Sequence, residues 1–192
     1  YGYKLVIDIQ DIWPDSIMGP ISFFSTKLGK LALAPINKYA NITYAFADGL
    51  VAVSDTYLKK ADMELLPNER KAVVYIGANS LVFNELKDKK HSAPLTVTYI
   101  GTMAGSYDLE TVVKAAPHLK DKVRFQFIGG GEDEVKLRKI NEKLGGHVNF
   151  LGSMKYDDAM QVLSNADVAI NPIKLHAQQS ITNKLSDYFC CG

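Results

Sequence analysis

The stretch that decides the fold is Leu95–Ile100, with the sequence LTVTYI, followed by Gly101 and Thr102. This β-branched, apolar run predicts a buried strand, and residues 107–119 then follow with helical spacing. The same alternation continues along the chain, with strands expected at 123–128, 148–151 and 168–171 and helices at 132–144, 156–164 and 183–191. Alternating strands and helices of about ten residues predict βαβ units around a parallel sheet.

The first half of the chain shows the same pattern in less complete form. Strands are expected at 5–9, 50–53 and 72–76, and a helix at 57–66. The polar stretch 86–94, which ends in a proline, is typical of an interdomain linker. We therefore expect an α/β protein whose two Rossmann-like domains, residues 1–85 and 95–192, each contain a parallel sheet.

Composition and cysteine usage limit the class of protein. The chain is 47% hydrophobic and 22% charged with a formal net charge of +1, so its charge does not indicate a nucleic-acid partner. The two cysteines, Cys190 and Cys191, are adjacent, which argues against a disulfide or a CxxC metal pair and favours a reducing compartment. The histidines at 91, 118, 147 and 176 show no metal-binding spacing either.

The segment from residue 17 to residue 46 is apolar and aromatic, carries Lys27, Lys30 and Lys38, and has no acidic residue. One interpretation is one or two helices that pack on the sheet. The other is a basic amphipathic surface that meets a membrane or a lipid-linked acceptor. No apolar run in the chain reaches the roughly 18 to 20 uncharged residues that span a bilayer, so any membrane contact is expected to be peripheral.

The predicted strand ends of the second domain carry residues suited to ligand binding. In an open parallel sheet, ligands bind beyond the carboxyl ends of the strands. The sequence there reads Gly101-Thr102, Gly129-Gly130-Gly131, Gly152-Ser153 and Asn171-Pro172. Glycines let a backbone approach a ligand, although a glycine after a strand is also typical of a plain turn. The triple glycine precedes three carboxylates at 132–134, which would repel a pyrophosphate, so this loop suits a nucleoside.

The segment 178–188 runs from a polar loop into the last helix. Thr182 or Asn183 suits the N-cap, which leaves backbone N–H groups for an anion. Lys184 in the first turn opposes the helix dipole, so an anionic ligand would explain its presence; the alternative is a solvated lysine. Asp187 follows one turn later and can pair with Lys184 or hold a pair of ribose hydroxyls.

Ordered motifs cover nearly the whole chain: 6–15 (VIDIQDIWPD), 47–54 (ADGLVAVS), 74–79 (VYIGAN), 99–102 (YIGT), 127–131 (FIGGG), 150–153 (FLGS) and 183–188 (NKLSDY). Their order and spacing resemble the retaining glycosyltransferases of the GT-B fold known as glycosyl transferases group 1. Within that family, they are most similar to bacterial capsule, O-antigen and exopolysaccharide enzymes.

The resemblance implies that a nucleotide diphosphate sugar binds mostly to the second domain, and that transfer retains the anomeric configuration without a metal or other cofactor. It implies that the nucleobase of the donor binds near Gly129, Gly130, Ser153 and Met154. It also implies that the diphosphate binds near Gly101, Thr102, Thr182, Asn183 and Lys184, and that the ribose binds near Asp187. Asp11, at a strand end, is the expected acceptor-side base or hydrogen-bond partner. Trp13-Pro14 either plugs the core or lines the acceptor cleft.

Two departures from the family pattern concern charge. Thr102 and about Gly105 stand where the family usually has Arg and Lys, which leaves Lys184, with Lys174 or His176, as the source of positive charge. The family's paired glutamates fall on Gln179 and Asp187. Gln179 can hydrogen-bond a sugar as a catalytic-site residue, but it cannot stabilise an oxocarbenium ion as a carboxylate.

We expect an enzyme that adds a sugar to a saccharide or lipid-linked acceptor during surface polysaccharide synthesis, at the cytoplasmic face of the membrane. Two alternatives keep the fold: a sugar-nucleotide epimerase, which needs a carboxylate and histidine pair, and a non-catalytic nucleotide-binding module. The chain enters a strand directly after Tyr1 and ends at Gly192, which would close a helix. We therefore expect a fragment of a larger enzyme, with both domains incomplete.

Overall fold

The protein divides into two compact units, each with its own sheet and core. The computed structural model describes residues 2–14, 22–62, 66–78, 93–175 and 182–191. Unit 1 contains residues 1–76, and unit 2 contains residues 77–177 and 182–192. Most of the predicted linker, 86–92, lies outside the described residues.

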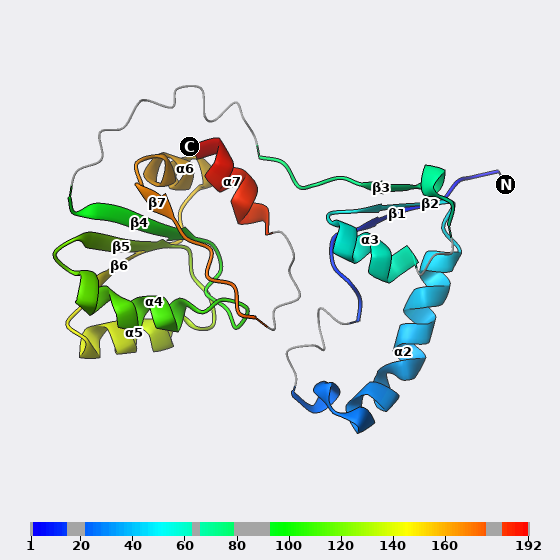
Figure 1. Ribbon diagram of the computed structural model, residues 1–192, viewed down its shortest axis with the longest axis horizontal. Helices are drawn as coiled ribbons and strands as arrows, with labels where there is room; N and C mark the ends of the chain where they lie inside the picture. The colour runs from blue at the N-terminus through cyan, green and yellow to red at the C-terminus, as the bar shows by residue number, and fades with distance from the viewer. Residues whose placement is uncertain (1, 15–21, 63–65, 79–92, 176–181, 192) are drawn as a thin grey trace. The chain divides into compact units, whose positions relative to one another are not determined.

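Unit 2 has a four-stranded parallel sheet in the order β6-β5-β4-β7 (Figure 1). Its strands are β4 (Leu95–Ile100), β5 (Val123–Ile128), β6 (Val148–Gly152) and β7 (Val168–Ala169). The first three match the prediction closely, whereas β7 is shorter than the predicted 168–171. Because β5 and β6 lie on one side of β4 and β7 on the other, the strand order reverses beside β4.

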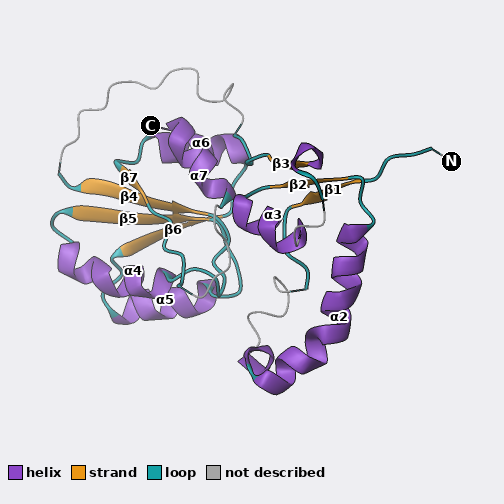
Figure 2. Cartoon of the chain, turned by 45° about the vertical axis from the view of Figure 1, so that its right-hand side comes forward, coloured by secondary structure: helices purple, strands orange, loops and turns teal. Residues whose placement is uncertain are grey.

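Helices cover both faces of this sheet (Figure 2). One face carries α4 (Leu109–Ala115), which continues as the 3-10 helix η4 (Ala116–Leu119), and α5 (Glu134–Lys143). The other face carries α6 (Tyr156–Ser164) and α7 (Asn183–Cys191), both at their predicted positions. This three-layer α/β/α arrangement confirms the predicted fold class for the second half of the chain.

Alternation along the strands separates the two cores of unit 2. On β4, Val97 and Tyr99 pack with the α4 and α5 side, whereas Ile100 packs with α6 and α7. Thr98 is fully buried, and its hydroxyl accepts a hydrogen bond from Nε2 of Gln126 on β5 at 2.8 Å. A satisfied buried hydroxyl of this kind lets a polar residue remain inside the sheet without an unpaired group.

Unit 1 has a three-stranded parallel sheet in the order β1-β2-β3, formed by β1 (Val6–Ile9), β2 (Gly49–Ala52) and β3 (Lys71–Val73). The 3-10 helix η2 (Asn68–Arg70) precedes β3. Helix α3 (Asp55–Asp62) packs on the sheet and begins two residues earlier than predicted. The cause is Ser54, whose buried hydroxyl accepts a hydrogen bond from the Tyr57 backbone N–H at 3.3 Å and so starts the helix.

The described part of the segment 17–46 is helical, with the short 3-10 helix η1 (Ser22–Ser25) followed by α2 (Lys27–Ala45). Thr26 caps α2, because its hydroxyl accepts from the Gly29 N–H at 3.1 Å. Leu33 and Ala40 are buried on one side of the helix, and α2 contacts η1 and α3. Packing of this segment on the sheet, the first interpretation, stays a prediction. Among the described residues, no helix combines the length and the apolar composition needed to cross a bilayer.

Candidate functional site

The candidate site lies at the carboxyl end of β4, where the strand order of unit 2 reverses. The last backbone bond between β4 and β7 runs from the Ile170 N–H to the Thr98 carbonyl at 2.9 Å. Beyond it the Tyr188 hydroxyl stands between the diverging strands, accepting from the Ile100 N–H at 3.3 Å and donating to the Ile170 carbonyl at 3.0 Å. Such a reversal point is where open α/β sheets bind their ligands.

Two loops form a rim around this point and are joined by backbone hydrogen bonds. The Asp108 N–H donates to the Pro172 carbonyl at 2.7 Å, and the Lys174 N–H donates to the Ser106 carbonyl at 3.0 Å. Between these bonds, Tyr107 pairs with Ile173 in an isolated antiparallel bridge. The loop that follows β4 is therefore fixed to the loop that follows β7.

Lys184, in the first turn of α7, places its ammonium group beside this rim. Its Nζ lies 3.6 Å from the ring centroid of Tyr107 and 5.4 Å from that of Tyr99. Burial lowers the pKa of Lys184 to about 8. Within the described residues, no carboxylate oxygen lies within ion-pair distance of it. A half-buried cation without a counter-ion, at a helix start, suits an anionic ligand.

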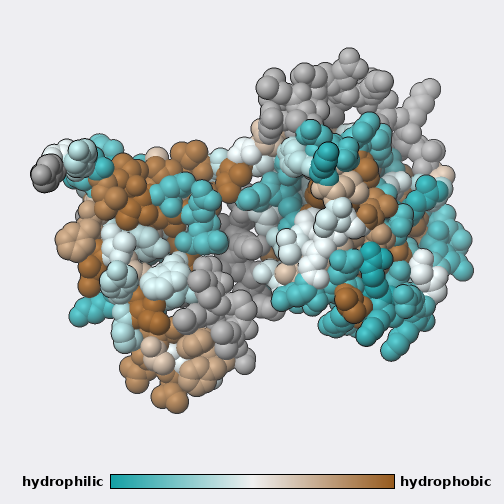
Figure 3. All heavy atoms as spheres, turned by 180° about the vertical axis from the view of Figure 1, so that it is seen from behind, coloured by the Kyte–Doolittle hydropathy of each residue, from teal (hydrophilic) through white to brown (hydrophobic). Residues whose placement is uncertain are grey.

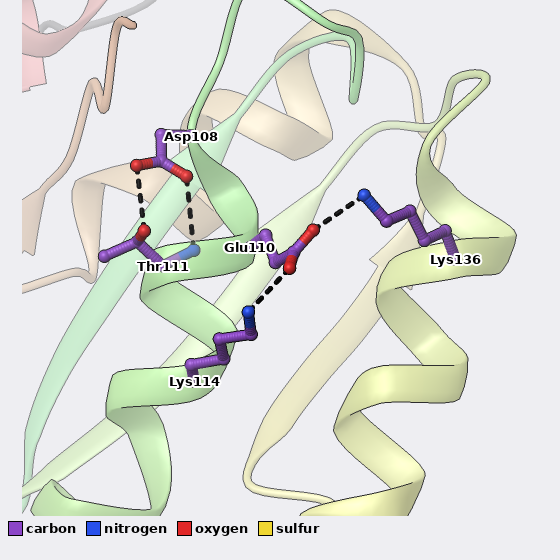
Figure 4. Close-up of polar contacts among 5 residues, drawn as sticks. All are labelled: Asp108, Glu110, Thr111, Lys114 and Lys136. Carbon is purple, nitrogen blue, oxygen red and sulfur yellow. Dashed lines mark hydrogen bonds and ion pairs between the residues drawn. The ribbon is translucent and has the colours of Figure 1, made fainter.

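The two lysines of the neighbouring cluster on α4 and α5 share one carboxylate, that of Glu110 (Figure 4). Glu110 lies 2.7 Å from Nζ of Lys114 and 2.6 Å from Nζ of Lys136, and their hydrogen bonds lower the pKa of Glu110 to about 2. These three residues line a small cavity of about 140 Å³ together with Lys174. Because Glu110 holds both lysines, Lys184 is the better candidate for an incoming anion.

The triple-glycine loop packs against the loop after β4. The Met103 N–H donates to the Gly130 carbonyl at 2.8 Å, and the Asp133 N–H donates to the Met103 carbonyl at 3.0 Å. Gly129 has a φ of 118°, and a Cβ there would overlap the Gly101 carbonyl oxygen. Close packing of two loops is therefore a structural reason for this glycine, beside the ligand approach that the sequence suggests.

The remaining predicted donor residues lie around the same sheet edge. Thr182 is buried, and its hydroxyl accepts from Nδ2 of Asn171 at 2.8 Å, whereas Asn183 is exposed at the start of α7. The sequence places Asn171 at a predicted strand end, and the structure shows that its Oδ1 is buried and has no hydrogen-bond partner among the described residues. Ser153 is exposed after β6, and Met154 packs partly into the core beside α6.

Asp187 is engaged by a tyrosine rather than by Lys184. The Tyr156 hydroxyl, at the start of α6, donates to Oδ1 of Asp187 at 2.6 Å. Burial raises the pKa of Tyr156, and the Asp187 carboxylate raises it further, so the hydroxyl stays protonated as a donor. Sequence reasoning missed Tyr156 because the contact joins residues 31 positions apart.

The predicted acceptor-side residues lie in unit 1. Asp11 is exposed after β1, Pro14 is buried, and Trp13 is 41% exposed, so the proline rather than the tryptophan packs inside. Burial raises the pKa of Tyr57, and the charge of Asp11 adds to that shift. Gln179 and His176 lie outside the described residues, so the roles of Asp11 and Gln179 stay predictions.

A metal site was not predicted, and metal-independent chemistry also stays a prediction. In the ranges that the structure describes, no group of three or more His, Cys, Asp or Glu side chains is arranged to hold a metal ion.

A family model described as glycosyl transferases group 1 matches residues 94–192, just over half of the chain. The chain belongs to this family. The matched residues include all of unit 2's strands and the entire rim around Lys184. Membership agrees with the resemblance carried by the ordered motifs. Among proteins with curated descriptions, none matches the sequence.

Solved structures with the GT-B fold resemble the chain at low sequence identity. HepE of Anabaena, in complex with UDP-glucose, has a TM-score of 0.67 at 19% identity, covering 98% of this chain and 51% of that one. The pneumococcal O-GlcNAc transferase GtfA, in complex with UDP and GlcNAc, gives 0.59 at 15%, covering 80% and 30%. The GT-B fold class is thereby confirmed, and the chain spans about half the length of HepE.

Proposed function

We propose that this chain provides the donor-binding part of an enzyme that transfers a sugar from a nucleotide diphosphate to a saccharide or lipid-linked acceptor. Transfer proceeds with retention and serves surface polysaccharide synthesis. The observation that carries the proposal is the Lys184 ammonium, which is half-buried at the strand-order reversal and lacks a carboxylate partner among the described residues.

The chemistry assigned to this group is stabilisation of the leaving diphosphate. Negative charge develops on the diphosphate as the bond to the sugar breaks, and a fixed cation beside a helix start stabilises that charge. Lys184 supplies the cation, and the backbone N–H groups at the start of α7, next to Thr182 and Asn183, supply the partial positive charge. Gly101 and Thr102 complete this end of the site. Because Lys184 and the helix start supply the positive charge, the proposal includes no metal or other cofactor.

The nucleoside is assigned to the other side of the sheet edge. Gly129, Gly130, Ser153 and Met154 receive the base, and Asp187 accepts hydrogen bonds from the ribose with the oxygen that Tyr156 does not use. HepE and the pneumococcal transferase were both solved with uridine nucleotides, which supports UDP as the first probe. Asp11 serves the acceptor as base or hydrogen-bond partner, and Gln179 hydrogen-bonds the transferred sugar.

The positions of two histidines favour transfer over epimerisation. An epimerase of this fold would need a histidine and a carboxylate near the sugar. In the described part of unit 2, His118 precedes β5 and His147 precedes β6. Both therefore lie at the amino ends of the strands, the sheet edge opposite to Lys184.

The outer side of α2 suits peripheral contact with an anionic membrane. Four apolar side chains are exposed and lie on one side of the helix, because their spacing follows the helical repeat: Leu28, Leu31, Tyr39 and Ile42. Three lysines at 27, 30 and 38 accompany this apolar stripe, and the helix has no acidic residue. Hydrophobic surface is visible on unit 1 in Figure 3. This combination of residues is typical of interfacial helices.

Calorimetry with UDP and the intact protein that contains this chain tests the diphosphate site. Lys184→Ala should raise the Kd for UDP about 10- to 150-fold, which corresponds to the roughly 1.5–3 kcal/mol of a charged hydrogen bond. Lys139→Ala removes an exposed lysine on α5 and is the matched control, with an unchanged Kd. Equal affinities for all three proteins would refute the assigned site.

A further inference from the structure

Two tyrosines lie beside the Lys184 ammonium, in the place where a buried lysine usually has a carboxylate. The Tyr107 ring is the nearer, with its centroid 3.6 Å from Nζ, well inside the roughly 6 Å range of cation–π attraction. The Tyr99 ring, 5.4 Å from Nζ, packs edge-to-face against Tyr107 with the centroids 5.8 Å apart. The cation therefore rests on an aromatic surface.

This aromatic surface is held in place independently of Lys184. Tyr99 is fully buried in β4, and its hydroxyl donates to the Thr102 carbonyl at 2.7 Å. The backbone of Tyr107 is fixed by its bridge to Ile173 and by the neighbouring Asp108 N–H bond to Pro172. Lys184 lies on α7, 77 positions after Tyr107 in the chain. The contacts that fix the Tyr107 backbone therefore do not involve the lysine that packs on its ring.

We infer that Tyr107 is a positioning residue, which holds the Lys184 ammonium at the carboxyl end of β4 without neutralising its charge. A carboxylate in this place would form an ion pair that an incoming anion must break. An aromatic face attracts the cation without neutralising its charge, and the N–H bonds that point away from the ring stay available to an anion. The inference rests on the proposed function, since the anion it serves is the donor's diphosphate.

The effect of the ring on Lys184 can be measured without ligand. In the intact protein with ¹³C-labelled lysine, stacking on Tyr107 shifts the Lys184 Cε resonance upfield through the ring current. Tyr107→Leu should remove most of this shift, with a smaller part left from the more distant Tyr99 ring, and Tyr107→Phe should retain it. If the leucine variant does not fold, Tyr107→Met is the second aliphatic replacement. An unshifted Lys184 resonance in the unmutated protein would overturn the inference.

Titration with UDP then tests the consequence for binding. Tyr107→Leu should raise the Kd about 5- to 30-fold, the range for a desolvated cation–π contact, and Tyr107→Phe should change it less than about twofold. In a Lys184→Ala background, Tyr107→Leu should have no further effect, whereas a purely structural role would weaken binding there too.

The outcomes separate the inference from the proposed function. If the unmutated protein binds UDP and Tyr107→Leu binds it equally well, the inference alone is wrong. Binding that falls equally in the Lys184→Ala background also overturns the inference, because Tyr107 would then act without the lysine. If the upfield shift is present but UDP does not bind, the proposed function fails and the inference fails with it.

Discussion

The side chain of Lys184 crosses directly over the α-carbon of Gly101, so that a Cβ at this position would overlap the Cε of the lysine. Gly101 also has a φ of 135°, which L side chains rarely adopt. The end of β4 and the start of α7 therefore pack closely, and the absence of a side chain at Gly101 leaves room for the side chain of Lys184.

Gly101→Ala should therefore displace the Lys184 ammonium and weaken UDP binding about tenfold or more, because a charged hydrogen bond is lost. The strained φ should also lower the free energy of unfolding by about 1–3 kcal/mol. Calorimetry and thermal unfolding measure the two effects. Gly146→Ala is the matched control: it has a positive φ of 74° but no neighbouring atom within 4 Å, so it should lose stability and keep its UDP affinity.

The affinity for UDP should depend on pH through Lys184. Burial lowers the pKa of this lysine to about 8, so the charged form that an anion needs is lost as the pH rises through 8 in the ligand-free protein. Because a phosphate is nearly fully ionised above about pH 7, binding should be nearly flat from pH 7 to 7.5 and weaken towards pH 8.5. Lys184 binds its proton more tightly in the unfolded chain than in the folded protein. As the pH rises above 8, this difference raises the free energy of unfolding.

Lys184→Arg is the control for the pH dependence, since a guanidinium remains charged throughout this range. Its affinity for UDP should stay constant from pH 7 to 8.5. A decline of the same size in the arginine variant would assign the titration to another group.

The Tyr156 hydroxyl should contribute to nucleotide binding by orienting Asp187 towards the ribose. Tyr156→Phe removes the 2.6 Å hydrogen bond and should raise the Kd for UDP about two- to tenfold, the range for one hydrogen bond. Tyr75→Phe is the matched control, because Tyr75 donates to Asp55 at 3.1 Å in unit 1 and has no assigned role with the donor. Equal losses in both variants, or none in either, would contradict the role of Tyr156.

Contact of α2 with anionic lipid can be tested by co-sedimentation of the intact protein with vesicles. The double variant Leu28→Ser/Leu31→Ser should lose at least about tenfold in binding to vesicles with 30% phosphatidylglycerol, because two apolar side chains leave the interface. Added salt should weaken binding too, since each lysine near the surface contributes about 1 kcal/mol. Val135→Ser, an exposed apolar residue on α5, is the control. Binding that survives the double variant would argue against this surface.

Unit 2 was the more predictable half because its signals are local. Leu95–Ile100 and Tyr156–Ser164 begin and end as the apolar spacing predicts. The early start of α3 was visible in principle as a serine before an aspartate at Ser54-Asp55, a common N-cap pattern. Strand β7 ends after Ala169, because the Ile170 carbonyl accepts from the Tyr188 hydroxyl and not from a backbone N–H of β4. Tyr188 lies 18 positions after Ile170, so local sequence does not predict this end.

The sequence points to the cation of the candidate site, Lys184, but not to the residues that surround it. Lys184 could be identified because a lysine at a helix start opposes the dipole. Tyr107 could not, because its contact with Lys184 depends on how two loops meet at the sheet edge. Gly129 was predicted as a donor-binding residue, and that role stays a prediction, whereas its close approach to Gly101 emerges only from the folded backbone.

The position of the diphosphate in a crystal structure of the intact protein with UDP is the decisive measurement. We expect a diphosphate oxygen about 2.7–2.9 Å from Nζ of Lys184, beside the Tyr107 ring and the first turn of α7. A diphosphate bound elsewhere, for example against Lys114 and Lys136 after displacement of Glu110, would contradict it.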